Sequence, residues 1–229
     1  MSRVTADLVT CEQCAASHPL RRYDSFNADS LGDQVDDIIN GTFERIHCAC
    51  GHSFQPEHPM LFTSFERKLW IVMHPPAERR FYAEIERDAE AILEEAYRDA
   101  TPAVQRGLEG IRPQLVFGHQ MLAEALRISL IEHDPALVEC AKLLWFRDSL
   151  PIVVAHPPFQ IVVQGLTAEG GLRCRLHDVV TGAALGDHVI VADYLRQAAA
   201  GRSQLEDEYQ ALFTRPYVSI CRFLFDDTI

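Results

Sequence analysis

Four of the seven cysteines in this 229-residue chain lie in two tight pairs, and this feature constrains the fold most. Two residues separate Cys11 from Cys14, and one separates Cys48 from Cys50. A Cys-x-x-Cys turn aims two thiolates at one ion about 2.3 Å away, so this spacing recurs in tetrahedral zinc sites. Gly51 follows Cys50 and permits the left-handed backbone that a metal-binding turn often needs. The pairs therefore predict one structural Zn²⁺ held by Cys11, Cys14, Cys48 and Cys50.

Three other interpretations of these cysteines remain open. The thiols are free and buried, as cysteines of protein cores often are. Alternatively, Cys11 and Cys14 form a redox pair, which needs the first cysteine at the start of a helix. A catalytic zinc ion needs three protein ligands and an open position, whereas four thiolates close the shell. The 33 residues between Cys14 and Cys48 exceed the usual spacer, so we expect an insertion there, at Asp33–Ile39.

Composition narrows the possible partners and the compartment. The chain has 33 acidic and 21 basic residues and a formal charge of −12, so phosphate backbones repel it unless a local basic patch prevails. The sequence MSRVTADLVTCEQC lacks the features of a secretion signal, and the longest apolar runs are too short to span a bilayer. We therefore expect a cytoplasmic protein without membrane association, in which clustered cysteines bind metal rather than form disulfides.

Patterning predicts an α+β fold in three parts. Residues 1–76 form a zinc-ribbon-like β module, residues 77–150 a helical region, and residues 151–229 an antiparallel sheet with short helices. In the first part the expected strands are Val4–Thr10, Leu20–Phe26 and Thr42–His47, with a hairpin over Phe62–Met73. Asn40-Gly41 is expected to end the short helix at Asp33–Ile39, and Pro75 and Pro76 to end the hairpin.

Helical periodicity and caps predict the middle part. A helix is expected over Glu78–Ala100, and Thr101-Pro102 starts another. Pro113 breaks the chain. Two antiparallel helices, His119–Glu132 and Pro135–Leu150, then form a hairpin, the second capped by Asp134.

Strand and turn signals predict the last part. Ser203 and Glu206 form a capping box, so a helix should begin there after a first helix over Asp193–Ala200. Gly170-Gly171 and Thr181-Gly182 are turn signals. The expected strands are Ile152–Ala155, Phe159–Gly165, Leu172–His177, Val189–Ala192 and Tyr217–Phe225.

The stretch Val9–Phe65 resembles the bacterial CpXC proteins, which are named for paired Cys-Pro-x-Cys motifs. The resemblance runs through VTCEQC, SFNADSLGDQVDDIINGTF, CACGHSF and KLWIVMHPP, and continues in QLVFGHQMLAEALRISLIEHDPALVECAKLL, to about residues 8–146. It implies a zinc-ribbon-like fold and no particular activity. Neither pair has the proline of the family: Glu12 stands in the first, and the second is one residue short. If the gap precedes Cys48, His47 takes the position of the third ligand, so His47 is a fallback ligand.

Other chemistry-bearing residues give weaker signals. Cys140, Cys174 and Cys221 are single and are expected to pack in the core, as are Trp70 and Trp145. The acids of the Glu78–Ala100 helix are expected to form a solvated face. The sequence contains no phosphate-binding loop and no H-E-x-x-H motif.

These features favour a non-enzymatic, zinc-stabilised module that binds a protein partner or regulates one. The helices of the middle part are long enough to self-associate, so a homo-oligomer is possible. A first alternative is a nucleic-acid-binding ribbon. A second is an enzyme with a site in the last part, although its candidate groups show no spacing logic. The residues for the two alternatives are, in turn, Arg21, Arg22, Arg45, Arg67 and Lys68, and His156, His177, Asp178 and His188.

Overall fold

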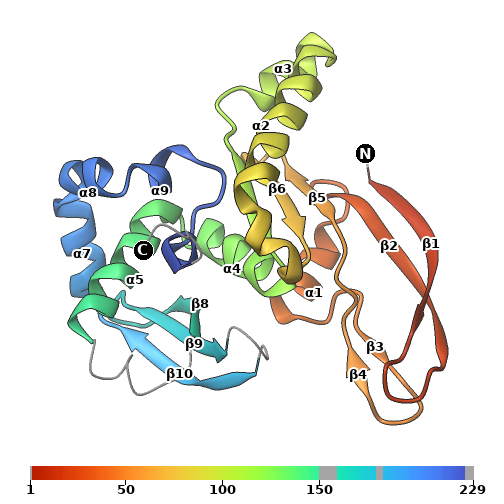
Figure 1. Ribbon diagram of the computed structural model, residues 1–229. Helices are drawn as coiled ribbons and strands as arrows, with labels where there is room; N and C mark the ends of the chain where they lie inside the picture. The colour runs from red at the N-terminus through yellow and green to blue at the C-terminus, as the bar shows by residue number, and fades with distance from the viewer. Residues whose placement is uncertain (1, 150–158, 179–182, 225–229) are drawn as a thin grey trace. The chain divides into compact units, whose positions relative to one another are not determined.

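The computed structural model describes residues 2–149, 159–178 and 183–224, and it divides into two compact units, residues 1–123 and 124–229 (Figure 1). The fold is α+β, as the patterning predicts. Each unit has a sheet of its own. The division of the sequence into three parts remains a prediction. Among the described residues, no helix combines the length and the apolar character needed to cross a bilayer.

A mixed five-stranded sheet organises the first unit, with strand order β1-β2-β5-β6-β7. The β1–β2 and β5–β6 pairs are antiparallel, whereas β2–β5 and β6–β7 are parallel. A separate two-stranded hairpin, β3–β4, lies between β2 and β5 in the chain. The strands are β1 (Arg3–Thr10), β2 (Ser17–Asn27), β3 (Ile46–His47), β4 (Ser53–Phe54), β5 (Met60–Ser64), β6 (Leu69–His74) and β7 (Pro113–Phe117).

The core of the first unit lies against β2, β5 and β6. Phe26 of β2 stacks on Phe62 of β5, with ring centroids 5.4 Å apart and planes 9° from parallel. Phe43 meets the Phe26 ring edge-on. Trp70 is buried on β6, as expected of a core anchor. Aromatic pairs of this kind add to the stability from buried apolar area, so this end of the sheet is the well-packed part of the unit.

Short helices connect these strands. Gly41 ends α1 with a left-handed φ of 72°, as the Asn40-Gly41 signal predicts. The helix from Glu78 is confirmed, although its first turn is 3-10 and Glu86 is buried rather than solvated. The elements are η1 (Gly32–Gln34), α1 (Val35–Asn40), η2 (Pro76–Phe81), α2 (Tyr82–Arg98), α3 (Pro102–Leu108) and α4 (His119–Leu130), of which α4 crosses into the second unit.

Pro113 begins a strand instead of merely breaking the chain. It is the first residue of β7, which pairs in parallel with β6 from Trp70↔Pro113 to His74↔Phe117. Proline is tolerated at the first position of an edge strand, because its missing N–H is not needed there. The proline signal acts locally, whereas the strand that pairs with β7 lies 43 positions earlier in the chain.

The second unit packs helices on a three-stranded antiparallel sheet of order β10-β9-β8, as predicted for the C-terminal part. Asp134 caps α5 by accepting the Ala136 N–H at 2.9 Å. Trp145 lies in the core between this helix and the sheet. The elements are α5 (Pro135–Asp148), β8 (Phe159–Leu166), β9 (Leu172–Asp178), β10 (Ala184–Ile190), α7 (Ala192–Ala200), α8 (Arg202–Glu208), α9 (Gln210–Thr214) and η3 (Ile220–Leu224).

Two predictions for this unit are wrong, and three more are not tested. The strand predicted at Tyr217–Phe225 is wrong, because Ile220–Leu224 forms a 3-10 helix. Ser203 lies inside α8, which begins at Arg202, and so it is not the cap. The strand at Ile152–Ala155, the turn at Thr181-Gly182 and His156 lie outside the described residues.

A buried ion triad connects the elements of the second unit. Lys142 of α5 donates to Glu124 of α4 at 2.7 Å and also to Glu139. Each carboxylate holds a backbone N–H as well: Glu124 accepts from Val163 at 2.6 Å, and Glu139 from Ile220 at 2.7 Å. Burial alone would lower the pKa of Lys142, but the two carboxylates raise it. The triad therefore ties α4, α5, β8 and η3 together around one charged ammonium.

Candidate metal centre

The first cysteine pair lies at the tip of the β1–β2 hairpin. The Cys11 N–H donates to the Ala16 carbonyl at 2.9 Å, and the Ala15 N–H to the Cys11 carbonyl at 2.8 Å. Ala15 adopts a left-handed φ of 57°, which is uncommon for a residue other than glycine. The loop therefore folds back on itself within six residues and turns both sulfurs to the same side. No helix begins at this pair, so the requirement for a redox Cys-x-x-Cys is not met.

The second pair lies at the tip of the β3–β4 hairpin. The Cys48 N–H donates to the His52 carbonyl at 2.8 Å, and the Gly51 N–H to the Cys48 carbonyl at 3.0 Å. Gly51 has a φ of 90°, a conformation that side chains disfavour. The tight turn of the second loop therefore requires a glycine at position 51, as the sequence predicts.

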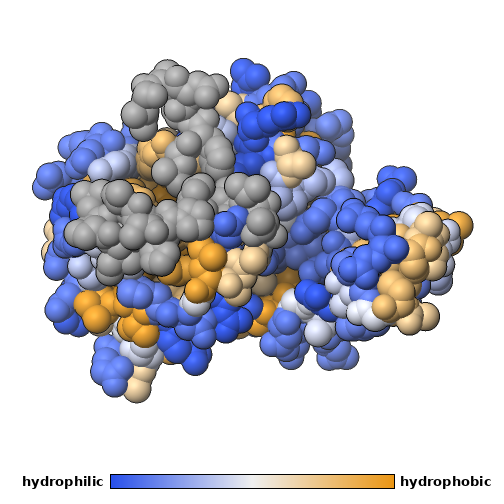
Figure 2. All heavy atoms as spheres, turned by 60° about the horizontal axis from the view of Figure 1, so that its bottom comes forward, coloured by the Kyte–Doolittle hydropathy of each residue, from blue (hydrophilic) through white to orange (hydrophobic). Residues whose placement is uncertain are grey.

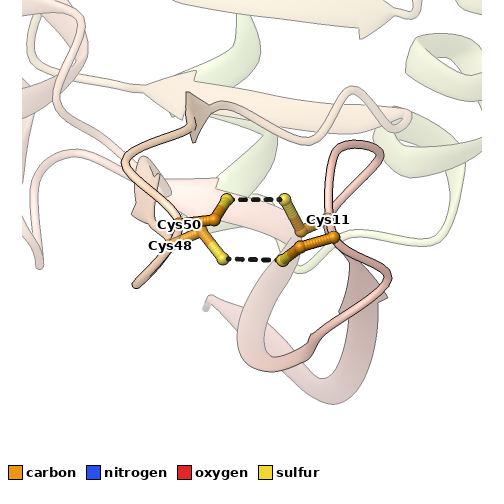
Figure 3. A group of neighbouring side chains, drawn as sticks. Cys11, Cys48 and Cys50 are labelled. Carbon is orange, nitrogen blue, oxygen red and sulfur yellow. Dashed lines mark hydrogen bonds between the residues drawn. The ribbon is translucent and has the colours of Figure 1, made fainter.

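The two loops face each other and bring their four sulfurs together (Figure 3). The Sγ atoms of Cys11 and Cys50 are 3.8 Å apart, those of Cys14 and Cys48 are 3.4 Å apart, and all four lie within 4.8 Å of one another. A tetrahedral ion with bonds of about 2.3 Å separates its sulfur ligands by about 3.8 Å. The donor set and its spacing therefore fit one tetrahedrally bound metal ion.

Each loop contributes one buried and one exposed cysteine. Cys11 and Cys48 are 1% and 7% exposed, whereas Cys14 and Cys50 are exposed. The free-and-buried interpretation therefore does not describe Cys14 and Cys50. The group of four sulfurs therefore lies at the surface of the two hairpin tips.

The fallback ligand, His47, lies outside the group of four sulfurs. His47 is an exposed residue of β3, paired with Ser53 of β4. Within the described parts of the chain, the group of side chains spaced to hold a metal contains the four cysteines and omits His47.

The local environment separates the thiol pKa values. Burial would raise the pKa of Cys11, but hydrogen bonds from the backbone of Cys14 and Gln13 lower it to about 7. The backbone of Ala16 favours the thiolate of Cys14, yet the neighbouring thiols of Cys48 and Cys50 raise its pKa to about 12. Four sulfurs this close cannot easily all be thiolates, because their negative charges repel. A bound divalent cation would offset this repulsion and release the protons.

The remaining cysteines are buried as expected. Cys140, Cys174 and Cys221 are at most 2% exposed. Burial raises the pKa of both Cys140 and Cys174 to about 12, so these thiols stay protonated and unreactive.

A buried histidine cluster beside the second hairpin was not detected in the sequence. Nε2 of His58 lies 2.6 Å from Glu44, whose other oxygen accepts the Tyr23 N–H at 3.0 Å. The ring of His119 lies 6.4 Å from that of His58, and its Nε2 meets the Pro56 carbonyl at 3.1 Å. Glu44, His58 and His119 carry no regular spacing, because three separate segments supply them. This cluster anchors the chain leading into and out of β3–β4.

Replacing Glu44 with glutamine is expected to destabilise the first unit in a pH-dependent manner. Burial would lower the pKa of His58, but the hydrogen bond that its ring donates to the Glu44 carboxylate raises this pKa above its ordinary value of 6.5. The charged pair therefore stabilises the fold fully below pH 6.5, and this contribution is lost as the pH rises through the raised pKa. Urea unfolding should show a loss of about 1.5–3 kcal/mol at pH 6 that shrinks by pH 8.5.

The matched control for Glu44→Gln is Glu78→Gln, which removes the carboxylate from the exposed His74–Glu78 pair at 2.7 Å. An exposed pair contributes about 0–1 kcal/mol, so this variant should match wild type closely. Both variants keep the other charged or titratable groups near His58, which are Glu57, His119 and Arg22. Burial raises the pKa of Glu57 to about 7 in either case. Equal losses in the two variants, or a loss independent of pH, would contradict the assignment.

Two hairpin tips bring four cysteine sulfurs to one point, a ribbon-like arrangement that could hold one metal ion. The family model described as CpXC protein matches residues 9–142, more than half of the chain, so this chain belongs to the CpXC family. This confirms the resemblance seen in the sequence. No curated protein and no solved structure gave a significant match.

Proposed function

We propose that this chain is a zinc-stabilised protein-interaction module of the cytoplasm without a catalytic centre. The single observation that supports this most is the four-sulfur shell. Zinc suits four thiolates in tetrahedral geometry, and a shell completed by protein ligands has no open position for a substrate. Such an ion acts as a structural staple.

The metal ion would hold together two hairpins whose strands bury few side chains. Of the eight residues of β1, none is buried, and neither is any of the four strand residues of β3 and β4. A metal ion shared by both tips supplies the crosslink that side-chain packing lacks. A rigid, exposed hairpin of this kind is a surface for a protein partner.

The enzyme alternative lacks a convergent site among the described residues. His188 of β10 pairs with Cys174, and its ring packs against the buried Trp145 with centroids 4.5 Å apart, so it lies on the core face. His177 lies two residues after Arg175 in β9 and so on the same face of the sheet. This is the face opposite to His188, where Arg175 binds Asp187. Because alternate residues of a strand point to opposite faces, His177 and His188 do not meet.

Two of the five basic residues named for the nucleic-acid alternative, Arg22 and Lys68, already have partners in the structure. Arg22 binds Asp7 at 2.9 Å and Asp24 at 3.3 Å. Lys68 donates to the carbonyls of Gly107 and Glu109. With an overall charge of −12, the first unit offers phosphates little attraction, and we expect no gel shift even at low salt. A salt-dependent shift would favour the alternative.

The purified protein is expected to contain one zinc ion per chain. Cys48→Ser should lose it, because serine cannot replace a thiolate ligand of zinc, whereas His47→Ala should retain it. Elemental analysis of both variants with wild type tests the ligand set. Zinc retained in Cys48→Ser and lost in His47→Ala would assign the third position to His47 instead.

Protein capture from lysate tests the interaction itself. Wild-type protein as bait should retain a protein that Cys48→Ser bait does not, at equal loading. An empty eluate from wild-type bait, with zinc at full stoichiometry, would count against the interaction function while leaving the metal site intact.

A further inference from the structure

The outer edge of β1 is an unpaired strand edge. β1 is the first strand of the sheet and pairs on one side with β2. The Cys11 N–H points inward to Ala16, whereas the Leu8 N–H points outward, where its partner is the neighbouring Asp7 side chain at 2.8 Å. Because N–H directions alternate along a strand, Val4, Ala6 and Leu8 present their amides and carbonyls on the free edge.

The same three residues form an apolar row on one face of the hairpin. Their cross-strand partners are Tyr23, Arg21 and Pro19. Leu8 is 70% exposed and Val4 40%. Figure 2 shows a group of moderately hydrophobic residues on the right, the side on which Figure 1 has β1 to β4. An exposed apolar edge strand is a template for another strand.

We propose that β1 pairs edge to edge and antiparallel with β1 of a second copy of this chain, with the twofold axis at Ala6. This pairing rests on the proposed interaction function in one respect: it names a second copy of the chain as one of the protein partners. In this register, Val4 lies opposite Leu8 of the second copy and Ala6 opposite Ala6. Each of these pairs exchanges two backbone hydrogen bonds, and the two apolar rows become continuous.

Charge complementarity favours the same register. On the opposite face, Arg3 lies diagonal to Asp7 of the second copy, close enough for an ion pair that would add to the Arg3–Asp24 and Arg22–Asp7 pairs of each copy. Moving the axis to Asp7 would oppose two aspartates, which is destabilising. Moving it to Thr5 would put Leu8 opposite Ser2 and break the apolar row. Of these three symmetric registers, the one with its axis at Ala6 places apolar residues opposite each other and also brings opposite charges close together.

The contact is small and so the dimer should be weak. One added strand pair buries less than a standard interface, and an association with Kd on the order of 10–100 μM is expected. The bond from Leu8 N–H to Asp7 must be exchanged on pairing, which also disfavours tight association.

Proline at position 6 tests the proposal without disturbing the monomer. The Ala6 N–H faces away from β2, so Ala6→Pro leaves the β1–β2 ladder intact, as edge strands tolerate such prolines. In sedimentation velocity from about 1 μM to 1 mM, wild type should shift from monomer to dimer and Ala6→Pro should stay monomeric. Both should retain equal zinc and equal thermal stability.

A crosslink locates the axis. Residues in a hydrogen-bonded antiparallel pair have Cα atoms about 5.5 Å apart, within disulfide reach. Ala6→Cys should therefore give a disulfide-linked dimer under mild oxidation, identified by mass spectrometry as residue 6 joined to residue 6. The control Val104→Cys, at an exposed position of α3, should not crosslink.

Three outcomes would overturn the proposal: a wild-type monomer at 1 mM, dimerisation of Ala6→Pro as strong as in wild type, or a crosslink at residue 104 instead of residue 6. Each is distinct from failure of the proposed function. A strictly monomeric chain that still captures another protein would refute the β1 pairing alone.

Discussion

Cys14→Ser is expected to lower the free energy of unfolding of the first unit by about 3–5 kcal/mol, the range seen when a protein loses a metal. Cys14 is an exposed residue in a hairpin loop. Without a metal, such a surface substitution would change stability by no more than about 0.5 kcal/mol. The large expected effect therefore follows from coordination alone.

The upper limit comes from small zinc modules, in which the metal contributes an apparent ~10–16 kcal/mol. We expect less here, because the Phe26–Phe62 core of the unit folds without the ion. In Cys14→Ser, the backbone should become disordered only near the metal site. Hydrogen exchange should accelerate at the tips of β1–β2 and β3–β4 and much less in β5 and β6, whose residues are largely buried.

Chelation supplies the control. A strong zinc chelator should lower wild-type stability to that of Cys14→Ser and leave the variant unchanged. Thermal unfolding with and without chelator measures both. A variant within 0.5 kcal/mol of wild type, or one that loses further stability with chelator, would show that Cys14 is not a ligand.

Lys142→Met is expected to destabilise the second unit by about 3–5 kcal/mol, because it leaves buried carboxylates without a counter-charge. Lys142, Glu124 and Glu139 are 2–5% exposed. Methionine fills a similar volume, so packing changes little. Burial already raises the pKa of Glu139 despite the nearby ammonium, and removing Lys142 should raise it further.

The loss should therefore depend on pH. A carboxyl group with a raised pKa in the folded state favours its protonated form, so the variant should lose stability as the pH rises above about 4.5. Urea unfolding at pH 5 and pH 8 should show the larger deficit at pH 8. A deficit below 1 kcal/mol at pH 8 would mean that the triad contributes little.

A neutral triad is the matched control. In the triple variant Lys142→Met, Glu124→Gln and Glu139→Gln, no buried charge remains, and each glutamine carbonyl can still accept the Val163 or Ile220 N–H. Replacing a complete buried ion set is often neutral or stabilising. The triple variant should therefore recover most of the stability and lose the pH dependence.

The sequence by itself determined the features that local chemistry encodes. The spacing of the cysteines and Gly51 indicated two metal-binding turns, and the structure brings their sulfurs together. Asp134 and Gly41 marked helix ends correctly. Each of these signals works within a few residues, because caps and tight turns are satisfied by neighbouring backbone groups.

Only the tertiary structure decided what depends on distant partners. The strand at Pro113 exists because β6 lies beside it, and Tyr217–Phe225 failed as a strand because alternation alone supplies no partner. The Glu44–His58 pair and the Lys142 triad join separate segments with no periodic signal. That β1 is an edge follows from strand order, which hydrophobic patterning does not specify, because every amphipathic strand has the same alternation wherever it lies in a sheet.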